Sequence, residues 1–268
     1  MPVKYRFEEL RTRDLNHQSG IVYRRRRTDP VPLGARINAH IDAALVAERD
    51  AQRPRDYLGA SRIGEPCARR LVYEFTKTPV DPGKEFAGQT LRIFEAGHVF
   101  EDLAIRWLRA AGFDLRTEKR GGGQFGFETA GGRIRGHVDG VIVGGPNVEI
   151  PWPALWEHKA LKASSWNDTA KKGVQVSKPV YFAQMQIYMG YMGLDAALFT
   201  ALNKDTCELY HEYVPLDAAE AQALSDKAVD VLRAADAGEL LPRIATHADF
   251  YLCRFCPFSL RCWSEERP

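Results

Sequence analysis

The apolar pattern of the chain changes at Gly112, and this change constrains the fold more than any other sequence feature. Residues 88–112 carry apolar side chains at the 3.6-residue spacing of an amphipathic helix, including Leu91, Val99 and Trp107. Beyond Gly112 the pattern becomes that of short strands separated by Gly- and Pro-rich turns. A long helix that leads directly into several short strands is typical of a domain that mixes both element types.

Apolar spacing and turn residues predict the other elements. Helices are predicted over residues 35–49, from about Glu65 through the CARRLVYEF segment, over 180–193 and over 217–237. Strands are predicted over 114–118, 124–128, 133–143, 154–161, 196–203 and 208–214. The order predicts an α/β fold whose strands lie near the middle of the chain.

Composition narrows the class of protein. The chain has 268 residues, of which 45% are hydrophobic and 27% charged, so it can bury a sizeable core and is neither collagenous nor wholly disordered. No apolar run reaches the ~18–20 residues that a membrane span needs. The first residues, MPVKYRFEELRTRD, contain no apolar stretch of a secretory signal. We therefore expect a cytoplasmic protein with no membrane partner and with reduced thiols.

Charge is concentrated at the start of the chain. The formal net charge is only +2, but residues 1–27 hold eight basic residues against three acidic ones. We expect residues 1–34 to form a basic N-terminal arm, which either contacts a phosphate backbone or is simply solvated.

Two carboxylates and a lysine fall on predicted neighbouring strands. Asp139 lies in RIRGHVDGVIV, and Glu157 and Lys159 lie in LWEHKAL, where strand alternation places them on one face and His158 on the other. Carboxylate oxygens bind Mg²⁺ or Mn²⁺, and a lysine beside them offsets phosphoryl charge. The combination indicates phosphodiester hydrolysis. The pattern alone is also typical of a surface salt-bridge ladder, but its apolar flanks favour partial burial.

Two helices add candidate residues. His98 and Glu101 are three residues apart and share a helix face, so either could supply a further metal ligand. Gln184 and Tyr188 are four residues apart, within about 40° of each other around the helix axis. They could contact a nucleic-acid backbone or Lys159. Each pair alone is equally compatible with ordinary packing.

Taken in order, His98, Asp139, Glu157-x-Lys159 and Gln184-x-x-x-Tyr188 resemble the RecB-like branch of the PD-(D/E)XK nuclease superfamily, over roughly residues 61–262. The resemblance implies a restriction-endonuclease-like core with a mixed central sheet flanked by helices. It implies a Mg²⁺ or Mn²⁺ ion held by His98, Asp139, Glu157 and the backbone carbonyl of His158. It assigns catalysis to Lys159, Asp139 and Glu157, and substrate binding to Gln184 and Tyr188. Some relatives use a helix glutamate instead of the histidine, so Glu101 is the alternative to His98.

Three of the five cysteines fall within ten residues. Cys253, Cys256 and Cys262 form a C-x₂-C-x₅-C pattern, which indicates a four-cysteine metal site in a chain with reduced thiols. The spacing is compatible with zinc or with an iron–sulfur cluster, and the fourth ligand would be Cys67 or Cys207.

One cysteine before the core and three after it resemble the AddB nuclease subunit and the iron–sulfur exonucleases associated with CRISPR adaptation. This resemblance implies a [4Fe–4S] cluster held by Cys67, Cys253, Cys256 and Cys262, with Cys207 an ordinary thiol. The expected parts of the chain are the arm over 1–34, a helical part over 35–86, a nuclease core over 87–240 and an iron–sulfur segment over 241–268.

From the resemblance we expect a Mg²⁺- or Mn²⁺-dependent DNA exonuclease that acts on single-stranded ends, with protein partners in recombination, repair or CRISPR adaptation. Two other classes stay open: a catalytically silent DNA-binding scaffold and a zinc-stabilised DNA-binding protein. His137 shares the strand face of Asp139 and could line the site. Trp166, the basic loop over 171–178, Arg69, Arg70 and Arg254 could contact DNA, or be an ordinary loop and surface charge.

Overall fold

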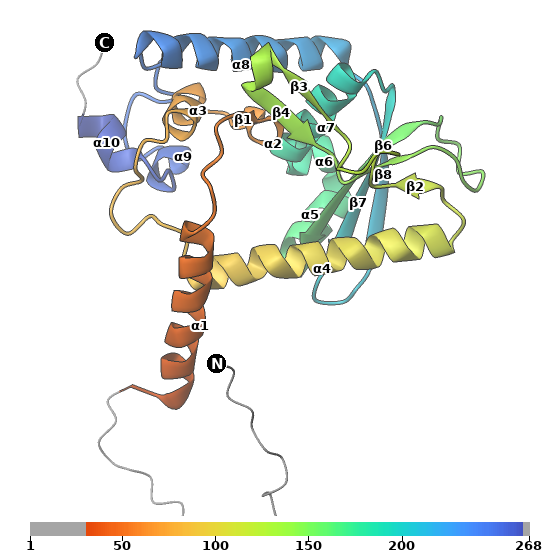
Figure 1. The fold of residues 1–268 in the computed structure, drawn as a ribbon, viewed down its shortest axis with the longest axis horizontal. Coiled ribbons are helices and arrows are strands. Elements are labelled where there is room, and N and C mark those ends of the chain that lie inside the picture. Colours follow the sequence, from red (N-terminus) through yellow and green to blue (C-terminus); the bar gives the residue numbers. More distant parts are fainter. Residues whose placement is uncertain (1–30, 265–268) are drawn as a thin grey trace, which may run out of the picture. The chain divides into compact units, whose positions relative to one another are not determined.

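The computed structural model describes residues 31–264, so most of the predicted basic arm lies outside the described residues. The chain divides into two compact units between His40 and Ile41. Helix α1 (Leu33–Asp50) crosses this division, and every later element belongs to the second unit (Figure 1). Among residues 31–264, no helix has the length and apolar character needed to cross a bilayer.

The second unit is built on a five-stranded mixed sheet in the order β2-β5-β6-β7-β8. At its centre β6 (Ala154–Leu161) and β7 (Ala196–Asn203) run parallel, and all other neighbours are antiparallel. β7 is buried at every residue, so both faces of the sheet must be covered. The other three strands are β2 (Leu115–Arg116), β5 (Gly140–Ile142) and β8 (Leu209–Pro215). The predicted α/β class with a mixed sheet is confirmed.

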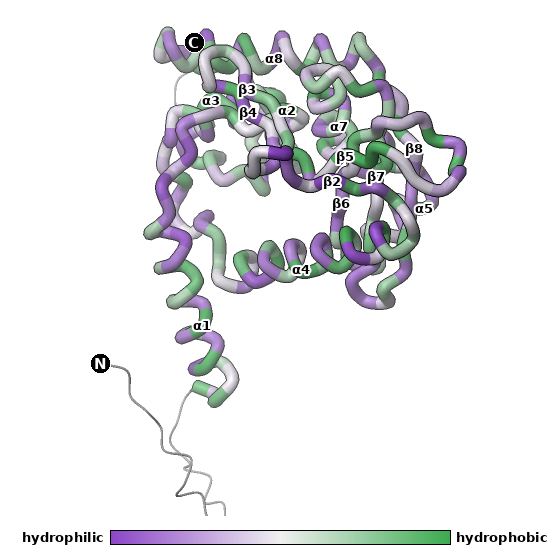
Figure 2. Tube along the Cα trace, turned by 45° about the vertical axis from the view of Figure 1, so that its right-hand side comes forward, coloured by the Kyte–Doolittle hydropathy of each residue, from purple (hydrophilic) through white to green (hydrophobic). Residues whose placement is uncertain are grey.

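Helices cover both faces of this sheet (Figure 1). Helix α4 (Gly88–Ala110) lies on one face, where Leu108 packs with the fully buried Trp156 of β6. Helices α7 (Pro179–Met192) and α8 (Ala218–Ala237) lie on the other side, in the larger core. Hydrophilic and hydrophobic stretches alternate along α4 and α8 in Figure 2, as expected for helices with one apolar side.

A second, three-stranded sheet has the order β1-β4-β3, with β1 (Leu58–Gly59), β4 (Ile134–His137) and β3 (Gly126–Thr129). The predicted single strand over 133–143 is wrong, because β4 and β5 belong to different sheets. The chain crosses between them at Val138 and Asp139. Val138 is fully buried, and its N–H donates to the Phe125 carbonyl at 3.0 Å, which fixes the crossing.

Short helices complete the described part of the chain. They are α2 (Ala60–Ile63), α3 (Ala68–Phe75), α5 (Ala163–Lys172), α6 (Val174–Ser177), α9 (Tyr251–Arg254) and α10 (Ser259–Ser264), with a 3₁₀ turn, η2, over Ala130–Gly132. The predicted loop over 171–178 is largely wrong, because α5 and α6 occupy most of it. Its backbone hydrogen bonds are helical, with the Lys178 N–H donating to the Val174 carbonyl at 2.8 Å.

Candidate active site

The crossing between the two sheets brings Asp139 next to β6. Gly140 pairs with Trp156 in the antiparallel β5–β6 ladder. The backbone N–H of His158 donates a 2.8 Å hydrogen bond to Asp139 Oδ2. The predicted adjacency of the segments that carry Asp139 and Glu157 is therefore confirmed.

Glu157 is fully buried, and only one of its two carboxylate oxygens is hydrogen-bonded. Its Oε1 accepts a hydrogen bond of 2.7 Å from Gln184 Nε2 and another from the Lys159 ammonium. Its Oε2 is buried and has no hydrogen-bond partner within residues 31–264. Burial raises the pKa of Glu157 to about 8, and the nearby Asp139 carboxylate adds to this rise. The Lys159 ammonium compensates this buried carboxylate at Oε1 only, so Oε2 is buried without compensation.

Lys159 lies between the two carboxylates. Its Nζ contacts Glu157 and is 3.9 Å from Asp139 Oδ2. The same nitrogen donates to the His158 carbonyl at 3.0 Å and lies 5.3 Å from the centre of the Tyr181 ring. Burial opposes charge on Lys159, but Glu157 and Asp139 outweigh it and raise its pKa. Lys159 is therefore a cation rather than a base.

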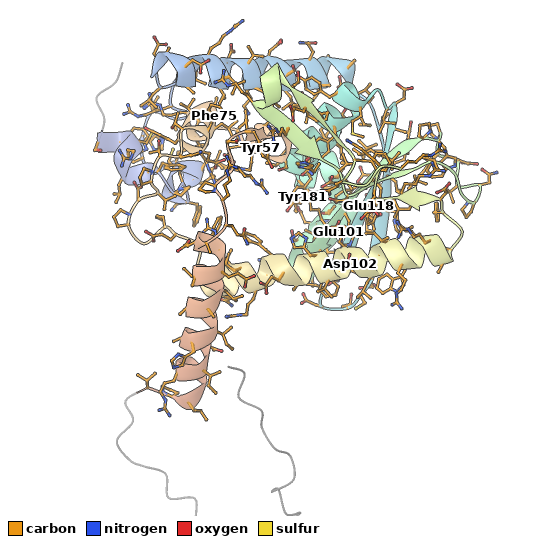
Figure 3. The ribbon with its side chains drawn as sticks, in the orientation of Figure 1. Tyr57, Phe75, Glu101, Asp102, Glu118 and Tyr181 are labelled. Atoms are coloured by element: carbon orange, nitrogen blue, oxygen red, sulfur yellow. The ribbon has the colours of Figure 1, made fainter. Side chains whose placement is uncertain are left out.

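Glu101, not His98, is the helix residue that the structure brings to this group. The His98 side chain is 80% exposed, and its Nδ1 is 3.9 Å from Glu101 Oε2. Glu101 is only 26% exposed, and burial together with the Asp139 charge raises its pKa to about 7. Figure 3 labels Glu101 on α4 and Tyr181 at the start of α7.

Gln184 and Tyr188 are both buried on α7. The Tyr188 ring packs edge-to-face on Phe127 with centroids 6.0 Å apart, and burial raises the pKa of its phenol. A Cβ at Gly136 would lie 2.6 Å from Tyr188 Cε1, so the glycine makes room for the ring. Gln184 therefore contacts Glu157, whereas Tyr188 is packed in the core.

Other predicted candidates lie outside this group. His137 is exposed and sits edge-on to Tyr57, with ring centroids 6.4 Å apart. Trp166 is partly buried, and its indole N–H donates to the Ala201 carbonyl at 3.0 Å. The His158 ring stacks on Trp156, and burial together with the Lys159 charge lowers its pKa to about 4.

The sequence analysis missed Tyr181, whose ring faces Lys159. The available signal was its place three residues before Gln184, a spacing that puts both side chains on one side of α7.

The donor set fits a hard divalent cation. Among residues 31–264, no group of three or more His, Cys, Asp or Glu side chains is already arranged as a metal site. However, Asp139 and Glu157 are each held through one oxygen, and Glu157 Oε2 is buried without a partner. Glu101 adds a third carboxylate nearby. Oxygen donors of this kind are those that Mg²⁺ and Mn²⁺ prefer.

Comparison with known proteins gives a fold but no family. No protein-family model and no curated protein matches the chain. An alkaline exonuclease (LHK-Exo) from Laribacter hongkongensis matches with a TM-score of 0.50 and 16% identity, over 75% of this chain and 93% of that one. This chain shares the fold of that exonuclease. The structure of LHK-Exo in complex with dAMP matches over the same shares, with a TM-score of 0.50 and 17% identity. SSO0001 matches with a TM-score of 0.49 and 18% identity, over 86% of this chain and 98% of that one.

Cysteines, which are common metal ligands, line a second cavity that does not include the active-site carboxylates. The cavity is lined by four cysteines, namely Cys67, Cys253, Cys256 and Cys262, together with Arg70, Arg243 and other residues. Burial raises the pKa of Cys253 and Cys256, so both thiols keep their protons in the absence of a metal. Cys207 is exposed and does not line this cavity. Within residues 31–264 these thiols are not arranged as a ready metal site, so the structure does not show the predicted cluster, although four thiols suit a soft metal or a cluster chemically.

Proposed function

We propose that the chain is a Mg²⁺- or Mn²⁺-dependent deoxyribonuclease of the RecB-like PD-(D/E)XK type that degrades single-stranded DNA from its ends. The meeting of Asp139, Glu157 and Lys159 at the crossing between the sheets carries this proposal. The fold shared with an alkaline exonuclease supports it, and the dAMP complex of that protein supports DNA as the substrate.

In this proposal the acidic residues bind the metal ion, and Lys159 compensates negative charge on the substrate. Asp139, Glu157 and Glu101 would hold the ion, with the His158 carbonyl as a further oxygen and His98 as the alternative to Glu101. When bound, the ion polarises the scissile phosphate and activates a water molecule. Lys159 Nζ keeps its proton and offsets the charge that grows on the phosphoryl oxygens. Gln184 orients Glu157 through its 2.7 Å hydrogen bond, and the buried Tyr188 supports Gln184 rather than meeting DNA.

The cysteine cavity is assigned to a [4Fe–4S] cluster, with zinc as the alternative occupant. Such a group would join α3 to the C-terminal segment, closing a long loop of chain and stiffening it. Protein partners in recombination, repair or CRISPR adaptation are proposed from the sequence resemblance.

The test is a cleavage assay on protein purified without oxygen. End-labelled single- and double-stranded oligonucleotides are incubated with Mg²⁺ or Mn²⁺. We expect the single strand to be shortened from an end, and Asp139→Asn and Lys159→Ala to lower the rate by at least about 100-fold. The exposed-thiol variant Cys207→Ser is the control. Wild-type rates in both site variants would refute the site.

The same preparation separates the alternatives. Tight single-strand binding with no cleavage under any metal condition would favour the scaffold class instead. A brown protein that contains iron supports the cluster, whereas a colourless protein with stoichiometric zinc refutes it.

A further inference from the structure

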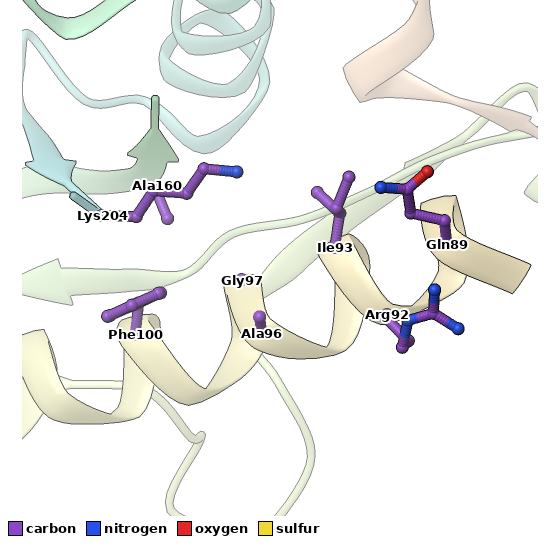
Figure 4. Close-up of a pocket in the computed structure, with 8 residues that line it drawn as sticks. All are labelled: Gln89, Arg92, Ile93, Ala96, Gly97, Phe100, Ala160 and Lys204. Atoms are coloured by element: carbon purple, nitrogen blue, oxygen red, sulfur yellow. The ribbon is translucent and has the colours of Figure 1, made fainter. Parts of the chain in front are cut away.

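A pocket of about 270 Å³ lies beside the candidate active site, between α4 and the ends of β6 and β7 (Figure 4). We call it the α4 pocket. It is lined by Gln89, Arg92, Ile93, Ala96, Gly97, Phe100, Ala160 and Lys204. Its volume is just below the ~300–1,000 Å³ typical of sites for drug-sized ligands, which suits a ligand of about one nucleotide.

The pocket adjoins the carboxylates through two elements. On α4, Gly97 lies four residues before Glu101, which is about 6 Å along the helix and about 40° around it. On β6, Ala160 directly follows Lys159. A strand whose phosphate lies at Asp139 and Glu157 therefore has its next unit within reach of the pocket.

The charge of the pocket is opposite to that of the site. Arg92 and Lys204 line it and no acidic residue does, whereas the neighbouring site holds three carboxylates and one lysine. Arg92 is already paired with Asp42. Within the described part of the chain, Lys204 has no carboxylate partner. A cation held without a counter-ion in a concave site attracts an anion such as phosphate.

The shape of the pocket depends on small residues. A Cβ built on Gly97 meets nothing within 4 Å, so this position opens directly into space. Ile93, which is 50% exposed, and the half-buried Phe100 flank the opening with apolar surface. Figure 4 shows Ile93 and Phe100 on either side of Gly97, with the Lys204 side chain opposite them. An aromatic ring beside a cation is a common arrangement for binding one base and its phosphate.

We propose that the α4 pocket binds the nucleotide next to the scissile phosphate, with its phosphate at Lys204 and its base against Phe100 and Ile93. This inference rests on the proposed nuclease function and adds a substrate-binding subsite to it. It also accounts for the exposure of Ile93 on α4.

Two variants test the subsite by different means. Gly97→Leu fills the pocket, and because Leu favours helix over Gly, we expect the melting temperature to rise rather than fall. Lys204→Ala removes the free cation. Val99→Leu, on an exposed part of α4, and Arg106→Ala, on the side of α4 opposite Gly97, are the matched controls.

The measurement is steady-state cleavage of single-stranded oligonucleotides by the full chain. We expect KM to rise about tenfold in both pocket variants with kcat little changed, as for loss of one base or phosphate contact. Binding of fluorescein-labelled oligo(dT) in the Lys159→Ala background should weaken by the same factor. Both controls should match their parent protein. An unchanged KM and unchanged binding in Gly97→Leu and Lys204→Ala would overturn the subsite.

The two proposals fail in different ways. If the wild-type protein cleaves but the pocket variants keep its KM, the subsite is wrong and the nuclease function stands. If the wild type never cleaves, the function is wrong, and the oligo(dT) measurement still decides whether the pocket binds a strand. A parallel fall in kcat and melting temperature would indicate damage to the fold and would count against the subsite.

Discussion

Gln184 Nε2 lies 2.7 Å from Glu157 Oε1 and donates a hydrogen bond to it across 27 residues of sequence. This bond fixes the orientation of a fully buried carboxylate whose second oxygen has no partner within residues 31–264. The site is therefore pre-arranged at a cost in stability, as is common where groups await a ligand.

Replacing Glu157 with glutamine should stabilise the metal-free protein at high pH. The pKa of Glu157 is raised from 4.5 to about 8, so between these values the folded protein keeps a proton that the unfolded chain releases. Metal-free stability therefore falls as pH rises through this window, and Glu157→Gln removes that loss. At pH 8 in EDTA we expect a higher melting temperature, with each kcal/mol worth about 2–4 °C.

The advantage of Glu157→Gln should shrink toward pH 5, and added Mg²⁺ should stabilise the wild type but not the variant. The exposed Glu95→Gln serves as the control. A variant that melts below the wild type at pH 8 in EDTA would contradict the account of Glu157.

Divalent-ion affinity should increase with pH. The pKa values of Glu101 and Glu157 are raised to about 7 and about 8, so at pH 6 both carboxyl groups hold protons that an ion must displace. Each ion therefore releases two protons below about pH 7 and one between about pH 7 and 8, so the apparent Kd falls up to about 100-fold per pH unit and then about tenfold. We expect this fall between pH 6 and 8 and a plateau above about pH 9, measured by calorimetry with Mn²⁺. Equal affinity at pH 6 and pH 8.5 would be evidence against these groups as ligands.

Glu101 and His98 should differ in their effect on ion binding. Glu101 is electrostatically linked to Asp139 and Lys159, whereas the His98 side chain is 80% exposed. We expect Glu101→Gln to weaken Mn²⁺ binding by at least about tenfold. His98→Ala should have a much smaller effect in the same titration. The reverse order would restore His98 as the ligand.

The elements predicted most accurately are those whose own residue pattern depends on local structure or burial. β7 was predicted with its observed ends because a run of apolar residues reports burial on both faces. Helix α8 was predicted over 217–237 from its apolar spacing, and the structure shows Asp217 as its N-cap, accepting from the N–H groups of Ala219 and Glu220 at 3.0 Å. The break between β4 and β5 was missed because Val138 and Val141 continue one apolar stretch, and the change of sheet depends on distant partners.

The site was predicted in the same uneven way. Strand alternation placed Glu157 and Lys159 on one face and predicted their approach to Asp139. The choice between His98 and Glu101 could not be read from spacing, because residues three apart differ by only about 60° around a helix. Only the packing of α4 on the sheet decides which of the two faces the carboxylates. The partner of Gln184 depended likewise on how α7 packs.

Gly136 should not tolerate a side chain because two aromatic rings pack against it. An added Cβ would lie 2.5 Å from Phe127 Cε1 and 2.6 Å from Tyr188 Cε1. Since neither ring can move freely in the core, Gly136→Ala should cost about 1–3 kcal/mol in the free energy of unfolding. Gly144→Ala, where a Cβ meets nothing within 4 Å, is the matched control. Urea denaturation measures both, and equal midpoints would refute the packing argument.

Asp81 should hold the C-terminal cysteine segment in place. It is only 5% exposed, and its carboxylate accepts hydrogen bonds from the N–H groups of Leu260 at 2.6 Å and Arg261 at 3.2 Å. Its own N–H donates to the Pro257 carbonyl at 2.8 Å. These contacts lie between Cys256 and Cys262, so they position the chain that carries both thiols.

Asp81→Ala removes the acceptor of the Leu260 and Arg261 N–H groups, and because both residues are exposed and water can replace the carboxylate, we expect a cost of about 0.5–1.5 kcal/mol for each hydrogen bond. Because the loss is local, we expect faster hydrogen exchange in peptides covering residues 251–264 and unchanged exchange in β7. The content of bound iron or zinc should fall in parallel, since two of the four cysteines lose their support. Asp114→Ala, which removes only an exposed pairing with Arg116, should change neither quantity. If the 251–264 peptides exchange at the wild-type rate in Asp81→Ala, the carboxylate does not anchor this segment, and the cysteines are held by other contacts.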